Sequence, residues 1–427
     1  IPLQIRSGTV EIKSEPTGAE VFLGSELLGQ TPIKLNKVFA QTKRYRLTLP
    51  RHKAVDLYCN LQDNQKIELF HDFKSKKVAL NTDAPNSKVI LLGGEEHSLP
   101  WEGMLPLGKN YIRIINSNNL ISNLKLIDVL RDGEGRFDLQ YNSSGVLRCY
   151  DNTGAFKGLL RGIADFEITG DGSQLIALSM NGDVSSVYMK DNVLSHKTVL
   201  NGAVLIAETP GFQAASMSDG RLLYWGVTKD TNGQLIPSTK MMELEVKGKL
   251  VKIQGSRTAD RLIGLGKDGQ LYDFPLSGEK ILTPPKYRAL DFSFNNVTAG
   301  VLLADASGGS VVSWPLSNNT VIWRETPVKI AVGLSEIYGL MDNGDVVMSR
   351  TIVTDEKLPE SDIENIFGGP SHNGLFLVKK SGNIIIYDGD GGYQLAGNVK
   401  LPDYSGIKTY KVSYDPIHRL TYVLSDR

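Results

Sequence analysis

The sequence is short of the residues that build most metal and disulfide sites. It contains only two cysteines, Cys59 and Cys149, among 427 residues. Two cysteines exclude a multi-disulfide framework and every zinc or iron–sulfur site built from cysteine alone. The six histidines show no His-x-x-x-His or His-Glu pairing of the kind that binds zinc. We therefore expect no metal site and no cofactor.

Long apolar runs and an excess of one charge are also lacking. The longest apolar runs, such as residues 384–387, fall far below the ~18 residues that a membrane-spanning helix needs. Lys plus Arg equals Asp plus Glu at 47 each, so no overall field attracts nucleic acid or an anionic membrane. The sequence therefore predicts no span within residues 1–427 and no nucleic-acid partner. Because the chain begins with Ile1, we expect an anchor or signal segment before it.

Turn residues and strand formers are abundant. The chain has 43 glycines and 18 prolines, together with many Val, Ile, Leu, Thr and Tyr residues. This composition favours short strands joined by tight turns, so we predict an all-β fold with few helices. A length of 427 residues is too great for one ordinary domain and indicates roughly two to four folding units.

Residues 8–24 form two alternating apolar runs separated by Pro16, Thr17 and Gly18, which predicts a strand, a turn and a strand. A second turn at 24–29 and then Gln30-Thr31-Pro32 precede further alternating strands at 45–49 and 54–61. The segment resembles the PEGA family: Pro16-Thr17-Gly18-Ala19 stands at its name motif and Gly29-Gln30-Thr31-Pro32 at its Gly-x-Thr-Pro turn. The resemblance implies a small β-sandwich over residues 1–75.

A weaker copy of this unit follows. Residues 78–85 and 89–93 repeat the first hairpin, and Leu99-Pro100 stands where Thr31-Pro32 stood. The copy has Asn86-Ser87-Lys88 in place of the Thr-Gly-Ala element. We expect a second PEGA-like sandwich over residues 76–132. PEGA-like modules occur mostly on the extracytoplasmic side of bacterial and archaeal envelopes, often beside membrane anchors. The resemblance therefore implies a periplasmic or cell-surface bacterial protein tethered by a segment before Ile1.

The rest of the chain repeats one unit, in which an apolar strand, a turn ending in glycine and a second apolar strand follow one another. The turn glycines are Gly145, Gly182, Gly220, Gly269, Gly309, Gly344 and Gly382. A repeat of about 40 residues with a central Asn-Gly or Asp-Gly turn is typical of β-propeller blades. We predict a seven-bladed β-propeller over residues 133–427. Its units resemble WD repeats, with Tyr150-Asp151 and Tyr387-Asp388 at the Trp-Asp position.

The two ends of the propeller region are incomplete units that match each other. Residues 408–415 and 419–425 supply two strands without a third and fourth, whereas residues 146–151 and 156–160 have none before them. Joined in one blade, these strands would remove two exposed sheet edges. We therefore expect the N- and C-terminal strands of the propeller region to close the ring.

Motifs of enzymes are weak throughout the sequence. Residues 264–269 match Gly-x-Gly-x-x-Gly, but a strand rather than a helix is expected after them, so an ordinary blade turn is favoured. Residues 388–392 resemble part of a calcium loop without its remaining ligands, and a turn is favoured there too. No Gly-x-Ser-x-Gly elbow is present. We therefore predict a protein without catalytic residues.

Two segments are candidate binding sites. The stretch 42–53 carries five cations and no acid, namely Lys43, Arg44, Arg46, Arg51 and Lys53. It could contact an anionic glycan, a lipid head group or an acidic partner, although a solvated edge strand is the favoured interpretation. Residues 227–240 account for much of the extra length of the longest blade, and we expect a projecting loop there. Candidate partner contacts are Lys229, Asp230, Leu235, Ile236 and Trp323.

These observations favour an extracytoplasmic, non-catalytic scaffold in which tandem PEGA-like sandwiches carry a propeller that docks a protein partner. A glycan-binding or cell-wall-binding envelope protein is the alternative, using the basic stretch and aromatic residues such as Trp101 and Trp323. A propeller enzyme is the third hypothesis, and it requires carboxylates, histidines or a metal that converge in a central pocket.

Overall fold

The computed structural model describes most of the chain. The described residues are 6–24, 26–49, 52, 54–92, 94–141, 145–168, 175–190, 193–229, 235–246, 248–256, 259–275, 288–294, 299–303, 311–314, 327–332, 336–349, 355–368, 374–387, 401–415 and 418–426. Every regular element among them is a β-strand, so the chain is all-β. The described part contains no helix of the length and apolarity needed to cross a membrane.

The N-terminal unit is a sandwich of two sheets. Its strands are β1 (Ser7–Glu15), β2 (Glu20–Leu23), β3 (Glu26–Gln30), β4 (Ile33–Phe39), β5 (Thr42–Thr48), β6 (Val55–Asn60) and β7 (Lys66–Asp72). One sheet has the order β4-β1-β7 and the other β3-β2-β5-β6. Alternate residues of each strand, including Val10, Ile12, Tyr45 and Leu47, face inward and form the core between the sheets. We call β1–β7 the first sandwich.

A second sandwich repeats this topology. Its strands are β8 (Ser75–Thr82), β9 (Lys88–Ile90), β10 (Glu96–Ser98), β11 (Trp101–Pro106), β12 (Gly108–Ile115), β13 (Lys125–Val129) and β14 (Arg136–Leu139). The sheet orders are β11-β8-β14 and β10-β9-β12-β13, which match the first sandwich strand for strand. In both units the first strand pairs antiparallel with the fourth and parallel with the seventh. The duplication expected from the sequence is thus present in the strand order.

The turn that differs between the copies keeps its backbone geometry. In the first sandwich the amide of Thr31 donates to the carbonyl of Ala19 at 2.8 Å, and in the second Leu99 donates to Ser87 at 2.8 Å. By these hydrogen bonds Ser87 takes the place of Ala19, so Asn86 takes the place of Gly18 rather than of Thr17, as the sequence had suggested. Gly18 has φ 92° and Asn86 has φ 54°. Asparagine adopts positive φ more readily than most residues, so it can replace the glycine of the motif here.

The end of the second sandwich lies later than the sequence suggested. We expected this domain to end at residue 132, yet β14 pairs in parallel with β8, with Phe137 opposite Leu80. Residues 136–139 therefore belong to a sheet of the sandwich rather than to the propeller. We propose that the domain covers residues 75–139, because a parallel partner strand far along the chain leaves no local turn signal.

Residues from Gly145 onward form a β-propeller. The strands are β15 (Gly145–Asp151), β16 (Phe156–Ile168), β17 (Leu175–Ser179), β18 (Val184–Lys190), β19 (Val193–Leu200), β20 (Ala203–Glu208), β21 (Gln213–Met217), β22 (Leu222–Lys229), β23 (Leu235–Leu244), β24 (Leu250–Gly255), β25 (Arg261–Gly266), β26 (Leu271–Pro275), β27 (Ala289–Phe294), β28 (Ala299–Leu303), β29 (Val311–Trp314), β30 (Lys329–Val332), β31 (Ile337–Leu340), β32 (Val346–Ser349), β33 (Asp355–Lys357), β34 (Ile363–Gly368), β35 (Leu375–Lys379), β36 (Ile384–Tyr387), β37 (Thr409–Asp415) and β38 (Leu420–Ser425).

These strands make seven antiparallel blades among the described residues. Five blades are separate sheets, β20-β21-β22-β23, β24-β25-β26, β27-β28-β29, β30-β31-β32-β33 and β34-β35-β36. The other two share the long strand β16 in a sheet of order β19-β18-β17-β16-β15-β38-β37. In that sheet the C-terminal β38 pairs with β15, with Leu424 opposite Leu147, as expected for the two incomplete ends.

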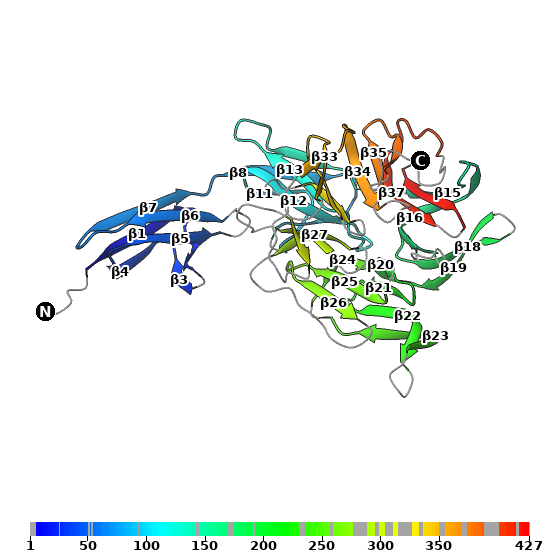
Figure 1. The fold of residues 1–427 in the computed structure, drawn as a ribbon, viewed down its shortest axis with the longest axis horizontal. Helices are drawn as coiled ribbons and strands as arrows, with labels where there is room; N and C mark the ends of the chain where they lie inside the picture. Colours follow the sequence, from blue (N-terminus) through cyan, green and yellow to red (C-terminus); the bar gives the residue numbers. More distant parts are fainter. Residues whose placement is uncertain are drawn as a thin grey trace.

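The first strands of neighbouring blades lie beside one another. Each first strand contacts the next, in the order β16, β20, β24, β27, β30, β34 and β37. The last of them, β37, also contacts β16. Residues from all seven of these strands line a central channel. Figure 1 shows the propeller strands gathered at one end of the molecule and the first sandwich extending away at the other.

Most turn glycines have the backbone that the repeat predicted. Gly182, Gly220, Gly269, Gly344 and Gly382 have φ between 82° and 95°, a region that favours glycine. Gly145 instead begins β15, and Gly309 lies outside the described residues. The Gly-x-Gly-x-x-Gly segment, 264–269, is the end of β25 and a turn into β26, as expected. Residues 388–392 lie outside the described part of the chain.

Candidate functional site

The second sandwich packs against the propeller and covers one end of the channel. Ile112 and Ile114 share an apolar core with Ile176 and Ile206 of the first two blades. Ile115 packs in a cluster with Phe292 of the fourth blade. Polar contacts at the same interface are Asn118 to the carbonyl of Met180 at 2.8 Å, Tyr111 to the carbonyl of Pro327 at 3.3 Å, Lys267 with Glu96 at 3.0 Å and Lys109 with Asp342 at 2.8 Å.

Arg113 extends from β12 of this sandwich into the end of the channel. Its side chain is 7% exposed and donates to the carbonyl of Leu290 at 3.0 Å and to Asp291 at 3.5 Å. Lys252 reaches the same carboxylate oxygen of Asp291 at 2.8 Å. Burial works against ionisation of Asp291 most strongly, but the two cations outweigh it and hold the pKa of this carboxyl below its usual value. Asp291 therefore pairs with one cation from each domain, Arg113 of the second sandwich and Lys252 of the propeller, and this buried group links the two domains.

The channel contains a cavity of about 240 Å³. Its walls come from the first strands of all seven blades, and Arg113, Leu120, Ile121, Ser122, Asn123 and Tyr141 of the second sandwich and the segment after it contribute at one end. In six of the seven first strands a β-bulge interrupts the register, near the start of the strand in five and midway along the long strand β16. The residues after the bulge are Asp165, Leu205, Lys252, Asp291, Asn365 and Lys411, while Lys329 begins β30. Five of these seven residues are ionisable.

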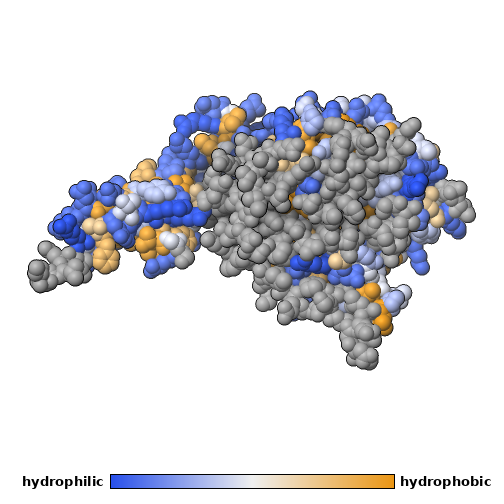
Figure 2. Space-filling model, viewed as in Figure 1, coloured by the Kyte–Doolittle hydropathy of each residue, from blue (hydrophilic) through white to orange (hydrophobic). Residues whose placement is uncertain are grey.

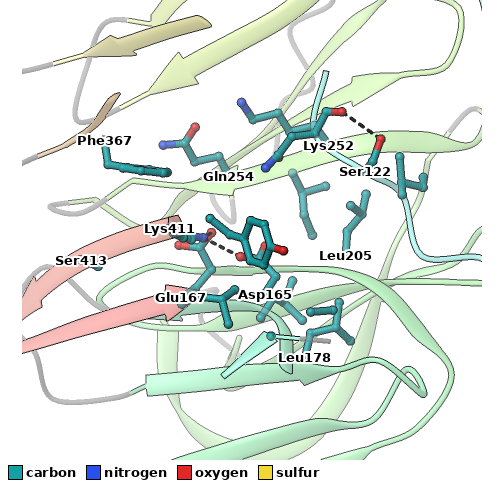
Figure 3. A pocket seen from close by; sticks show the side chains of 18 of the residues that line it. Ser122, Asp165, Glu167, Leu178, Leu205, Lys252, Gln254, Phe367, Lys411 and Ser413 are labelled. Atoms are coloured by element: carbon teal, nitrogen blue, oxygen red, sulfur yellow. Dashed lines mark hydrogen bonds and ion pairs between the residues drawn. The ribbon is translucent and has the colours of Figure 1, made fainter. Parts of the chain in front are cut away.

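On one side of the cavity Lys411 joins two acidic residues. Its ammonium lies 2.9 Å from Asp165 and 2.6 Å from Glu167. Burial opposes the charge of Lys411 most strongly, yet the two carboxylates outweigh it and raise the pKa of the lysine. Figure 3 shows this group on one side of the pocket, with Phe367, Gln254 and Lys252 on the other.

Lys329 differs from the other channel lysines because no carboxylate lies within ion-pair distance of it among the described residues. Its ammonium donates to Oδ1 of Asn365 at 2.5 Å and lies 3.7 Å from the centre of the Phe367 ring. Burial, together with the nearby cations Lys252 and Lys411, lowers the pKa of Lys329 to about 7. A lysine that carries its proton only partly at neutral pH faces the cavity.

The sequence analysis missed these channel residues. Five of them, Asp165, Lys252, Asp291, Lys329 and Lys411, each stand as a single polar residue between two hydrophobic ones, as in Val328-Lys329-Ile330 or Leu290-Asp291-Phe292. The recurrence of that pattern in successive blades was the available signal. The channel is charged, so it does not remove the enzyme hypothesis. However, Asp165, Glu167 and Asp291 form ion pairs with cations, and Glu208, which also lines the cavity, accepts a hydrogen bond from Gln213 at 3.3 Å. The described residues contain no cluster of three potential metal ligands from His, Cys, Asp and Glu.

The predicted loop at 227–240 is mostly a β-hairpin. Val227 pairs with Pro237, and Lys229 pairs with Leu235, so β22 and β23 extend well beyond the blade. A projecting segment was expected, but its backbone groups bond across the hairpin rather than remaining in a loop. Ile236 is 42% exposed, which agrees with the expected exposure. Asp230 and Trp323 lie outside the described residues, and the side chains of Lys229 and Leu235 are not described.

The basic stretch has less net positive charge around it in the structure than the sequence suggested. Arg44 and Arg46 lie on the outer face of β5 while Tyr45 and Leu47 are buried, as the alternation predicted. The neighbouring strand β6 brings Asp56 to 2.5 Å from Arg44, and this acid neutralises part of the patch. Lys43 lies on the same strand, whereas Arg51 and Lys53 lie outside the described residues. A local run of cations gave no sign of the acid on the partner strand.

Comparison with known families identifies the N-terminal unit. A sequence model of the PEGA domain matches residues 7–77. The first sandwich is a PEGA domain. The match covers the strands β1–β7 and the beginning of β8, and it confirms the resemblance found at Pro16 and Thr31. No sequence among the curated proteins matches the chain.

Solved structures that resemble the chain have low sequence identity to it. Prp20p from Saccharomyces cerevisiae is 12% identical, with 66% of this chain and 92% of that chain covered and a TM-score of 0.45. Human WBSCR16 is 9% identical, covering 66% and 99%, with a TM-score of 0.46. YCF48 from Cyanidioschyzon merolae is 11% identical, covering 62% and 94%, with a TM-score of 0.42. Likeness at this level says nothing about what this chain binds.

Proposed function

We propose that the protein is an extracytoplasmic, non-catalytic scaffold whose propeller docks a protein partner through the β22–β23 hairpin. In this proposal the PEGA domain is an arm that separates the propeller from an anchor preceding Ile1. The second sandwich and the propeller act together as the rigid body that presents the hairpin. The PEGA match supports the extracytoplasmic location, because such domains typically occur in proteins outside the cytoplasm.

The hairpin is the observation that carries this proposal. β23 is ten residues long and lies at the edge of its sheet, so its outer backbone groups have no neighbouring strand in that sheet. Ile236 and Met241 are 42% and 38% exposed along this strand. Figure 1 shows the hairpin projecting from the propeller far from the first sandwich, and Figure 2 shows apolar surface beside it. An exposed edge strand with apolar side chains is a surface that an extended segment of another protein can pair with.

The test is capture of a protein partner by the purified chain from envelope extract, followed by chemical cross-linking to locate the contact. We expect a protein cross-linked near β23, and we expect the double variant Ile236→Glu, Met241→Glu to lose it. Leu130→Glu is the matched control, because Leu130 is 57% exposed on the second sandwich and far along the chain from the hairpin. Equal capture by the double variant, or retention of polysaccharide alone, would rule out docking at this hairpin.

Glycan binding by the first sandwich is the second candidate function. The outer face of β5 and β6 brings Tyr58, which is 64% exposed, opposite Arg44 in the strand register. An exposed tyrosine beside a guanidinium offers a stacking surface and hydrogen-bond donors for an acidic sugar. A glycan array probed with the wild type and with Tyr58→Ala distinguishes the two functions. Binding of an acidic glycan that Tyr58→Ala abolishes would favour this second function, and no bound glycan would exclude it.

A further inference from the structure

We propose that the central channel binds a small organic monocarboxylate, whose carboxylate pairs with the ammonium of Lys329. This inference concerns a site inside the ring and is independent of partner docking at the hairpin. The starting observation is the pairing of charges around the channel. Lys411 pairs with Asp165 and Glu167, and Lys252 and Arg113 share Asp291. Among the described residues, Lys329 is left with a neutral amide and an aromatic ring as its partners.

A buried cation without an anion is costly, so its environment favours a ligand that supplies the missing charge. Asn365 turns its oxygen toward Lys329 and accepts a second hydrogen bond from the amide of Ile366 at 3.1 Å. Its amide nitrogen has no hydrogen-bond partner among the described residues. A carboxylate in the cavity would therefore find a charged donor in Lys329, which lines the cavity, while Asn365, which does not, leaves the charge of that lysine unpaired.

The cavity limits the size and charge of the ligand. A volume of about 240 Å³ lies below the ~300–1,000 Å³ typical of pockets for drug-sized molecules, so a short-chain acid fits the space better than a larger ligand. Apolar wall residues such as Leu205, Ala331 and Phe367 suit a hydrocarbon tail. A second negative charge would approach Asp165, Glu167 or Glu208, which also line the cavity, so a monoanion is favoured over phosphate.

Binding should depend on pH in a defined direction. The pKa of Lys329 is about 7, set by burial and by Lys252 and Lys411 against the opposing effect of Asp291 and Asp165. The carboxylate pairs with the protonated lysine, so affinity is greatest below this pKa. As the pH rises through and above it, affinity should fall by up to about tenfold per pH unit, because one proton must be taken up with the ligand.

The experiment is calorimetric titration of the full chain with butanoate near pH 6, with acetate and inorganic phosphate as comparison ligands. We expect butanoate to bind the wild type, and Lys329→Met to weaken binding at least tenfold. Lys77→Met is the control and should bind normally, because Lys77 lies on the surface of the second sandwich, paired with Glu102. Equal heats for wild type and Lys329→Met, or no heat with butanoate, would overturn the proposal. Tighter, Lys329-dependent binding of phosphate would overturn the choice of a monocarboxylate.

A second variant keeps the proposal testable if Lys329→Met does not fold. Asn365→Asp places a carboxylate of the protein beside Lys329, where the ligand is proposed to bind. We expect this variant to lose butanoate binding while its melting temperature rises above that of the wild type. Undiminished butanoate binding by Asn365→Asp would contradict the assignment of the site to Lys329.

Discussion

Arg113 is the residue that links the second sandwich most deeply to the propeller. Its guanidinium is buried and donates to the backbone of Leu290, to Asp291 and to the carbonyl of Ser122 at 3.4 Å. Asp291 keeps its closer partner, Lys252, whatever happens to Arg113. The loss of Arg113 would therefore remove hydrogen bonds at the domain interface without leaving an unpaired carboxylate.

Replacing this residue tests whether the interface stabilises the molecule. We expect Arg113→Met to lower the free energy of unfolding by about 2 kcal/mol, because the buried carbonyl of Leu290 loses a charged donor. Arg221→Met is the control and should change it by less than about 0.5 kcal/mol, since Arg221 forms an exposed ion pair with Asp219. Urea unfolding of both variants measures the difference. Equal midpoints for the two variants would mean that Arg113 does not stabilise the interface.

At the residue scale, the sequence predicted some positions and not others for a clear reason. Pro16, Gly18 and Thr31 were recognisable because a turn needs particular residues at fixed intervals. Lys329 and Asp291 were not, because alternation in a short strand indicates only that polar residues share one face. Whether that face meets solvent or a closed channel depends on how seven strands distant in sequence come together.

At the scale of elements, the turns between the second and third strands share one backbone conformation in the five blades whose turn glycine is described, but they differ in their surroundings. Gly382 has φ 95°, and a Cβ atom there would lie 2.1 Å from the carbonyl oxygen of Tyr404. Gly220 has φ 94°, and a Cβ atom there would meet nothing within 4 Å. A substitution at Gly220 therefore tests backbone strain alone, whereas a substitution at Gly382 tests backbone strain together with steric overlap.

Alanine at each position gives a matched comparison. We expect Gly220→Ala to cost about 1 kcal/mol of stability, which is the usual penalty for a non-glycine residue at positive φ. Gly382→Ala should cost at least about 2 kcal/mol more, because the backbone of Tyr404 must move to admit the methyl group. Denaturant midpoints of the two variants measure this difference. Equal losses would show that the turn at Gly382 is less closely packed than the structure indicates.

Elements were predicted well where pairing is local and poorly where it is not. The hairpins around Gly182 and Gly220 follow from turn residues between alternating strands. The parallel pairing of β14 with β8 has no such signal, which is why the domain boundary was placed too early. The residues before Lys240 were expected to form a loop because Asn232, Gly233 and Pro237 are typical turn residues, yet Pro237 lies within β23 at a sheet edge.

At the scale of the whole molecule, the C-terminal strands complete a blade that begins near residue 145. β38 lies between β37 and β15, and its residues Tyr422 and Leu424 pack in the core of the neighbouring strands. We expect deletion of residues 408–427 to expose the edge of β15 and to cause aggregation or a markedly lower melting temperature. Size-exclusion chromatography and thermal melting measure both effects. A monomeric protein with unchanged melting would show that this pairing does not hold the ring together.

The central claim is that the second sandwich and the propeller form one body, to which the PEGA domain is attached as a separate arm. Their shared apolar clusters and the buried Arg113 support the first part. The first sandwich has an apolar core of its own, which supports the second. The most direct test is differential scanning calorimetry of residues 1–427, 75–427 and 140–427. We predict that removing residues 1–74 leaves the main transition unchanged, whereas removing residues 75–139 lowers it sharply or abolishes it. A fragment 140–427 that melts at the temperature of the full chain would contradict the account.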